Sequence, residues 1–263
     1  MRLRVARIVA IVSALGWLVL PGFGLIDLAV TWSPDWPQVL EAGWGLFFTV
    51  IVAGPFLLVA AAPGRLAVAL AQLGIAAATL VVAAVLTSEP RLAALAGLIV
   101  VEAAIVGWLA RGGLSRSADT PPIVRVRWSM PLLAIVLIGA IPWLAYAWRM
   151  IGLDRMDAPV DLTLGIDHDA VQGALGLALV ALGLLAAAWP VGRWVLALSV
   201  GITAAYLGIV SFGWPGATGG VDQWWSMAAV VWGAAVILAG WPEGRRVDLP
   251  DGATERATFP AGR

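Results

Sequence analysis

The chain has one histidine, and it stands between two aspartates in the segment Asp167-His168-Asp169. Imidazole and carboxylate groups exchange protons near neutral pH and bind divalent metals, so this segment is the first candidate for chemistry. It also fits the start of a helix, with His168 as a boundary residue. In that interpretation Asp169 accepts hydrogen bonds from the first free amides, and Gln172 reaches back to the amide of the cap. We favour the helix start and keep two functional alternatives open.

The first alternative is a proton-responsive site, in which the flanking aspartates stabilise the charged form of His168. The second is a metal site, for which a single histidine needs further carboxylate ligands. Asp154, Asp157 and Asp161 fall on the same predicted side of the membrane and could supply them. Consecutive residues on one turn do not converge on one ion by themselves, so we assign no metal ligand and expect no cofactor.

Glu102 is the second candidate, because it lies near the middle of the apolar run 92–110. A charged carboxylate at that depth costs about 2.5–3.5 kcal/mol, so Glu102 is expected to be neutral, paired or exposed to water. It is either a proton carrier or substrate contact, or a protonated group that bonds a neighbouring helix. Polar residues of other runs are its candidate partners: Gln72, Thr79, Tyr146, Gln172, Thr203 and Tyr206.

The small residues of the same run indicate which way Glu102 faces. At roughly 100° per residue, they fall on the side of the helix opposite Glu102. They are Ala93, Ala96, Ala103, Ala104 and Gly107. If this small face packs against one helix, Glu102 looks toward a second neighbour or a cavity.

Arg149 lies near the end of another apolar run. A long cationic side chain in such a place extends to the membrane surface while its methylene groups stay in the apolar region. The alternative is an ion pair with Asp167 or Asp169 that joins the ends of two helices. The candidate polar cluster at the outer face therefore contains Arg149, Asp167, His168, Asp169 and Gln172.

The composition places these candidates in a membrane protein. Of 263 residues, 61% are hydrophobic and 12% are charged, whereas a soluble domain carries about 25% charged residues. Apolar runs of about twenty residues, enough to cross about 30 Å of hydrocarbon as helices, are separated by proline, glycine and charged residues. They cover approximately 8–30, 43–62, 66–87, 92–110, 130–150, 169–189, 194–214 and 224–241. Because backbone amides in lipid must be satisfied internally, the sequence predicts an all-α bundle of about eight transmembrane helices.

The arginines predict the orientation of this bundle. All sixteen basic residues are arginine, and with the N-terminus inside only Arg91, Arg149 and Arg155 fall on the outer side. Positive charge is enriched on cytoplasmic loops, so we predict a multi-pass protein of the plasma membrane with both termini in the cytoplasm. Most tryptophans fall at the predicted membrane boundaries and are interpreted as anchors. Only Trp17, Trp143 and Trp232 fall deeper.

The chain is predicted to form one transmembrane domain over residues 1–242, followed by a cytoplasmic tail, 243–263, without fixed structure. Arginines before the first apolar run imitate a signal peptide. The run continues past Leu20 without a small-residue cleavage site, so we expect an uncleaved first span.

Several functions are excluded or disfavoured by what the chain lacks. Without cysteine or lysine it has no thiolate metal site, no lysine Schiff base and no phosphate loop of the Gly-Lys-Ser type. The net charge of zero gives no argument for binding nucleic acid. No serine–histidine pairing, His-Glu-x-x-His run or acidic metal motif is visible, so we do not expect an enzyme.

The segment Leu164-Gly-Ile-Asp-His-Asp-Ala-Val-Gln-Gly-Ala-Leu-Gly-Leu177, preceded by Tyr146-Ala-Trp148, resembles a region of uncharacterised polytopic membrane proteins of high-GC actinobacteria. In those proteins a Gly-x-x-His motif precedes a glutamine and a span rich in alanine and leucine. The resemblance covers about residues 143–190 and implies a membrane location without implying an activity. Asp169 departs from it, because an aromatic residue is expected at that position.

Two classes of function follow from these features. A structural or accessory membrane protein without catalytic chemistry is favoured by the scarcity of polar groups inside the runs. The alternative is a small proton-coupled carrier that uses Glu102, with His168 and Arg149 near its outer mouth. The expected partners are the lipid bilayer and a second membrane protein or a second copy of the chain; the sequence names no substrate. A water-filled cavity at Glu102 would favour the carrier, and a sealed helix contact would favour the accessory protein.

Overall fold

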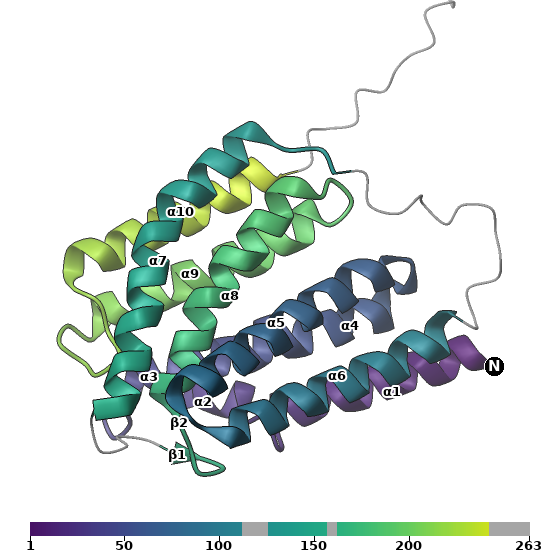
Figure 1. Cartoon of the computed structure of the whole chain (residues 1–263), viewed down its shortest axis with the longest axis horizontal. Coiled ribbons are helices and arrows are strands. Elements are labelled where there is room, and N and C mark those ends of the chain that lie inside the picture. Colours follow the sequence, from purple (N-terminus) through teal and green to yellow (C-terminus); the bar gives the residue numbers. More distant parts are fainter. Residues whose placement is uncertain (112–125, 157–161, 242–263) are drawn as a thin grey trace, which may run out of the picture.

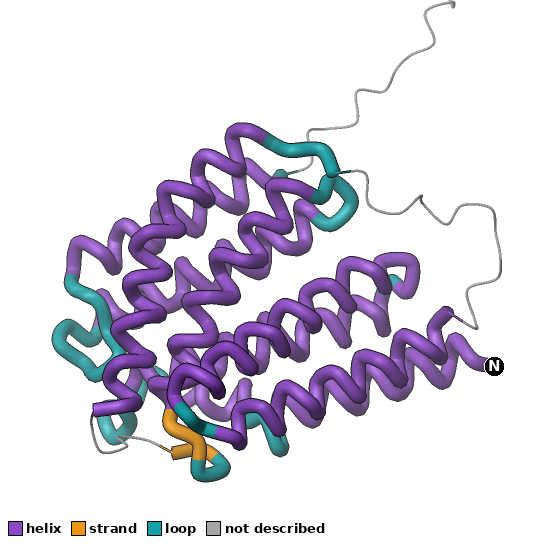
Figure 2. Tube along the Cα trace, in the orientation of Figure 1, coloured by secondary structure: helices purple, strands orange, loops and turns teal. Residues whose placement is uncertain are grey.

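The computed structural model describes residues 1–111, 126–156 and 162–241, which are almost entirely helical (Figure 1). Figure 2 shows a single short strand pair among the helices of these ranges. The predicted tail, 243–263, and two of the suggested metal ligands, Asp157 and Asp161, lie outside the described residues.

The helices form two groups that follow each other along the chain. The first group contains α1 (Arg2–Leu18), α2 (Gly24–Val30), α3 (Gln38–Leu46), the π-helix η1 (Phe47–Ala53), α4 (Gly54–Ala61), the 3-10 turn η2 (Pro63–Arg65), α5 (Leu66–Thr87) and α6 (Pro90–Arg111). The second group contains α7 (Met130–Met156), strands β1 (Leu162–Thr163) and β2 (Ile166–Asp167), α8 (His168–Ala188), α9 (Arg193–Gly213) and α10 (Gln223–Gly240). Contacts of α8 with α3 and α5 join the two groups.

Seven helical segments of the described chain are long and apolar enough to cross a membrane. They are Gln38–Ala61, Pro63–Thr87, Pro90–Arg111, Met130–Met156, His168–Ala188, Arg193–Gly213 and Gln223–Gly240. Each overlaps one of the last seven predicted runs, so the predicted all-α bundle of apolar helices is confirmed. Large apolar side chains such as Val85, Ile138 and Ile141 are exposed on its outside, as expected of helices that face lipid.

The predicted first span over 8–30 is wrong in its bounds. α1 begins at Arg2 and ends at Leu18, and a separate short helix, α2, starts after the left-handed residue Phe23 (φ 56°). Pro21 separates the two, because proline has no amide hydrogen and disfavours helical backbone at the preceding residue. α1 has 17 residues. At 1.5 Å per residue it is about 25 Å long, shorter than a hydrocarbon layer of about 30 Å.

α1 lies alongside α6 in the first group and also packs on α4 and η1 (Figure 1). The Arg2 guanidinium is 5.8 Å from the ring of Trp108, near the last turn of α6. The chain start, the turn that carries Arg65 and the end of α6 with Arg111 therefore lie at one end of this group (Figure 1). These arginines were all assigned to the cytoplasmic side.

The π-helix η1 is stabilised by a side chain from α5. Pro55 has no N–H, so it deprives the Val50 carbonyl of a π-helical partner and the Ile51 carbonyl of an α-helical one. The side-chain amide of Gln72 donates to both carbonyls, at 3.1 Å to Val50 and 3.3 Å to Ile51. The Ser199 hydroxyl of α9 donates in turn to Gln72, at 3.4 Å. Gln72 thus replaces the missing backbone donor.

Glycines allow α9 and α10 to approach closely. A Cβ added at Gly201 would lie 2.5 Å from the carbonyl oxygen of Gly233, and one added at Gly233 would lie 2.5 Å from that of Gly201. Any larger residue at either position would push the two backbones apart. Close packing of this kind drives helix association where lipid offers no hydrophobic gain.

Candidate functional site

His168 begins α8 and is fully enclosed, with 0% of its surface exposed. Its Nε2 lies 2.8 Å from the Thr163 hydroxyl of β1, and its ring stacks on Trp44 of α3 with 4.5 Å between ring centroids. The β1–β2 hairpin can fold back over this point because its two turn residues, Leu164 (φ 57°) and Gly165 (φ 73°), are both left-handed. His168 is therefore the boundary residue at the start of α8, as the sequence predicted, and its side chain is enclosed in the bundle.

The predicted helix start at this segment is confirmed, but its cap is a different aspartate. Asp167 is the N-cap of α8, and its carboxylate accepts the amide of Asp169 at 3.1 Å. The strand β2 ends at Asp167, so the helix begins two residues earlier than the capping box of Asp169 and Gln172 requires. That predicted capping box is wrong.

Gln172 points inward instead, and its amide joins α8 to α3 and α7. Its Nε2 donates to the Val39 carbonyl of α3 at 2.6 Å, and its Oε1 lies 2.7 Å from the Tyr146 hydroxyl of α7. That hydroxyl is also 2.9 Å from the carbonyl of Gly219, in the α9–α10 loop. A Cβ at Gly43 would lie 2.3 Å from the amide, so this position must be glycine. A buried amide with donor and acceptor both satisfied rigidifies the elements that it joins.

Two carboxylates that the sequence analysis did not single out are buried at the same end of the bundle. Asp27 of α2 is 5% exposed and Glu41 of α3 is 2% exposed. Glu41 lies one turn before Trp44, the residue on which the histidine ring stacks. Both residues engage other groups in the structure. For Asp27, its place inside the predicted run 8–30 was the available signal, because a buried carboxylate requires a compensating partner.

Glu102 forms a hydrogen bond with a residue of α1, and none of the partners that the sequence suggested forms a hydrogen bond with Glu102. Its carboxylate accepts a 2.7 Å hydrogen bond from the indole N–H of Trp17, in a half-buried contact between α6 and α1. The proposed partners bond elsewhere: Gln72 bonds η1, Tyr146 bonds Gln172, and Tyr206 accepts from Trp32 at 3.2 Å.

The opposite face of α6 looks toward α5. A Cβ at Gly107 would lie 3.2 Å from Leu70 of α5. The small residues and Glu102 thus face different neighbours, as the helical spacing predicted. The second neighbour of α6 is the helix α1.

Arg149 is separated from the other members of the predicted outer cluster. It is exposed on α7, whereas His168, Asp169 and Gln172 are buried. Among the described residues its guanidinium has no hydrogen-bond or ion-pair partner, so it does not join Asp167 or Asp169. The structure therefore divides the cluster into a buried part at α8 and an exposed cation on α7.

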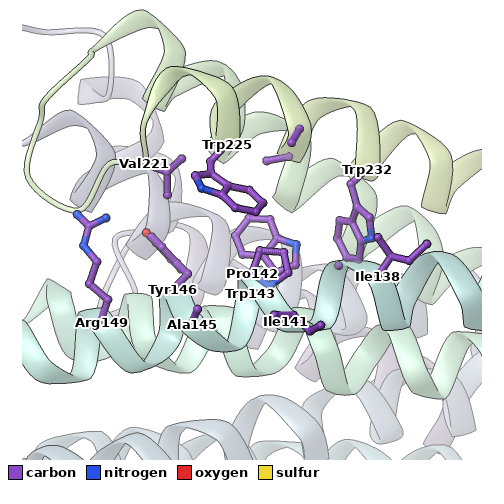
Figure 3. Close-up of a pocket in the computed structure, with 13 residues that line it drawn as sticks. Ile138, Ile141, Pro142, Trp143, Ala145, Tyr146, Arg149, Val221, Trp225 and Trp232 are labelled. Atoms are coloured by element: carbon purple, nitrogen blue, oxygen red, sulfur yellow. The ribbon is translucent and has the colours of Figure 1, made fainter.

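A groove of about 600 Å³ runs between α7 and α10, and Arg149 lies at one end of it (Figure 3). Its walls are apolar and aromatic, formed mainly by Ile138, Ile141, Pro142, Trp143, Trp225 and Trp232. A second groove, of about 420 Å³, lies between α5 and α6 beside Gly107 and Trp108. Neither groove is lined by Glu102 or His168.

No three histidine, aspartate or glutamate side chains of the described residues converge as ligands of a metal ion. The histidine is instead engaged by a hydroxyl and an aromatic ring. Asp154, the described member of the suggested ligand set, lies near the end of α7.

Comparison with known proteins assigns no family: no family model, no curated protein and no solved structure matches this chain.

Proposed function

We propose that this chain is a non-catalytic accessory protein of the plasma membrane, with both termini in the cytoplasm. Seven long apolar helices with exposed aliphatic side chains support the membrane location. The arginine distribution supports the orientation, because positive charge favours the cytoplasmic side. The resemblance of residues 143–190 to actinobacterial membrane proteins supports the same location.

The observation that carries the accessory role is the contact between Glu102 and Trp17. A proton-coupled carrier needs its intramembrane carboxylate to face water or a substrate path. Glu102 instead accepts from the indole N–H of a neighbouring helix, and it lines neither groove. Gln72 and Gln172 likewise donate to backbone carbonyls of adjacent segments. The polar groups inside the bundle are thus used to hold helices together.

The test is proton flux into proteoliposomes that contain the full chain and an entrapped pH-sensitive dye. Under an imposed pH gradient and membrane potential, we expect the wild type to match protein-free liposomes. Glu102→Gln is expected to behave identically. A flux through the wild type that Glu102→Gln abolishes and Trp17→Phe retains would overturn the accessory role, because Trp17→Phe keeps the carboxylate and removes only its partner.

A second candidate function, a proton-dependent change at the outer end, is favoured by the enclosure of His168. Its imidazole lies between Thr163 and Trp44, beside the buried carboxylates of Asp167 and Asp169. Further charged groups of adjoining elements include Glu41 of α3, Asp27 of α2 and Arg91 of α6, whose guanidinium donates to the Gly165 carbonyl. Asp154 of α7, which interacts with Asp167 and Glu89, adds to them. Ionisable groups inside a membrane protein are functional-site candidates. Protonation of His168 would add charge at the point where the hairpin rests on α8.

The absence of cysteine makes this second candidate testable by labelling a single introduced thiol. Leu164→Cys places the thiol on the exposed turn of the hairpin, and Asp35→Cys, in a separate variant, places a control thiol in the exposed α2–α3 loop. The measured quantity is the labelling rate of the hairpin thiol divided by that of the control thiol. If the position of the hairpin depends on protonation, this ratio should change between pH 5 and pH 8. The change should disappear in His168→Gln. A constant ratio across this range, or a change that survives His168→Gln, rules the candidate out.

A further inference from the structure

The cation at the end of the α7–α10 groove is available to an external ligand. The Arg149 guanidinium is exposed and has no partner among the described residues. Figure 3 shows it at the same end of the groove as Tyr146 and Val221. Trp148 and Trp225, both exposed, lie at this level of the bundle, where indole rings mark the boundary between hydrocarbon and water. An exposed arginine with no partner among the described residues, at this boundary, favours an anionic group.

The other end of the groove is apolar. Trp232 donates its indole N–H to the Ile135 carbonyl of α7 at 2.7 Å, which fixes the ring across the groove. Gly139 makes this possible, because a Cβ there would lie 2.2 Å from the ring. Trp143 packs at 5.9 Å from Trp232 and continues the aromatic wall. The groove thus offers one cation at its mouth and hydrocarbon contacts along its length.

The length of the groove matches one leaflet of a bilayer. Ile138 and Arg149, at its two ends, are eleven residues apart on α7. This separation is about 16 Å along a helix axis, or about half of a hydrocarbon layer of about 30 Å. A ligand with its charge at Arg149 would therefore reach the bilayer centre beside Trp232.

We propose that this groove is a binding site for a phospholipid with an anionic headgroup, held by Arg149 at its phosphate and by the groove at one acyl chain. The site goes beyond the proposed function and does not depend on whether the bundle moves protons. Charge complementarity selects the lipid as occupant, because the groove has one cation at its boundary and apolar walls below it.

The test measures lipid binding to the full chain by native mass spectrometry in detergent, with dioleoylphosphatidylglycerol and dioleoylphosphatidylcholine at equal concentration. One arginine near an anionic headgroup favours binding about fivefold, so phosphatidylglycerol should exceed phosphatidylcholine by that factor. Arg149→Gln should remove the preference. Arg155→Gln is the matched control, since this exposed arginine is on the same helix but does not line the groove. Equal binding of both lipids to the wild type, or equal losses in the two variants, would refute the site.

A second pair of variants tests the apolar part of the groove. Ala228→Trp places a ring in the groove and should reduce binding of both lipids, whereas Ala234→Trp on another exposed face of α10 should leave binding unchanged. A second copy of the chain seated on the groove would give the opposite pattern. The wild type would then form a dimer that Ala228→Trp disrupts, while lipid binding stayed at the wild-type level, and this result would overturn the proposal.

Discussion

The indole nitrogen of Trp17 donates a 2.7 Å hydrogen bond to the Glu102 carboxylate, and the same indole stacks on Phe48 with the two ring planes 6° apart. One side chain of α1 thereby contacts both α6 and η1. α1 is the shortest of the long helices, and its first turns contain three arginines. Hydropathy alone therefore does not determine where α1 lies along its neighbouring helices. The Trp17 contacts determine its register against its neighbours.

Removing the two ends of this bond should have non-additive effects. Trp17→Phe and Glu102→Leu should each destabilise the bundle, and the double variant should lose less than the sum of the two. Double-mutant cycles in membrane bundles give coupling energies of about 0.6–1.7 kcal/mol for such bonds, and we expect a value in this range. Unfolding equilibria in bilayer-like detergent measure it. Glu102→Gln keeps an acceptor for the indole and should lose less than Glu102→Leu; strictly additive losses would show that no bond couples the two residues.

Gln172→Leu should be among the most destabilising substitutions at the end of the bundle where α8 begins. It removes the donor to the Val39 carbonyl and one of the two acceptors of the Tyr146 hydroxyl, which keeps the Gly219 carbonyl. The loss of such buried hydrogen bonds costs about 1–3 kcal/mol. Tyr146→Phe should cost less, because Gln172 keeps its bond to Val39. Gln223→Leu, at an exposed position on the first turn of α10, serves as the control and should be nearly neutral. Thermal unfolding of the purified variants ranks them, and a Gln172→Leu variant as stable as Gln223→Leu contradicts the role of the amide.

The effects of substitutions at Gln72 and Pro55 on stability should be coupled, because Gln72 donates to the carbonyls that Pro55 leaves without a backbone donor. Gln72→Leu leaves the Val50 and Ile51 carbonyls without the side-chain donor, at a cost of about 1–3 kcal/mol. Pro55→Ala supplies a backbone N–H at the position where proline has none, so it should restore part of the stability in the Gln72→Leu background. The measurement is the unfolding free energy of the four chains in the cycle. No recovery in the double variant would mean that these carbonyls do not depend on Gln72.

Replacing glycine by alanine should lower the stability of the protein at Gly139 and raise it at Gly97. Gly139→Ala places a methyl group against the Trp232 ring and should destabilise the α7–α10 contact by about 1–3 kcal/mol. Gly97→Ala meets nothing within 4 Å and should stabilise α6 by about 0.5–1 kcal/mol through lower backbone entropy in the unfolded chain. Trp232→Ala should relieve the Gly139→Ala defect. Equal responses of the two glycines in thermal unfolding would argue against the close contact.

The sequence predicted the helices well because hydropathy over twenty residues is a property of the segment itself. It missed the break between α1 and α2, since Pro21 and its neighbouring glycines interrupt a helix without lowering the hydropathy of the run. The sequence analysis assigned the N-cap of α8 to Asp169, but the N-cap is Asp167. Both residues are aspartates, so residue type alone does not distinguish them. The hairpin decides between them, because β2 pairs through Asp167 before the helix starts.

The hydrogen-bond partners of the polar residues could not be predicted from the sequence, for a different reason. Helical spacing gave the direction of Glu102 correctly but not the identity of its neighbour, which is set by how α1 packs. The three tryptophans that the sequence placed deeper than the boundaries proved informative. Trp17 bonds Glu102, Trp232 bonds the Ile135 carbonyl, and Trp143 lines the α7–α10 groove. An indole away from the membrane surface needs a partner for its N–H, and that requirement was the usable signal.

The π-helical turns between Phe47 and Ala53 separate the length of this segment from the direction of its side chains. A turn closed from i to i+5 holds one residue more than a turn closed from i to i+4, yet both complete one revolution, so a single deletion here would return the segment to ordinary winding. Glu41 and Trp44 on one side and Phe56 on the other would then keep their present directions. A single deletion in the α-helical turns after Gly54 would instead rotate the side chains before it by about 100° relative to those after it. The π-helical segment can thus lose a residue without turning Trp44 away from His168.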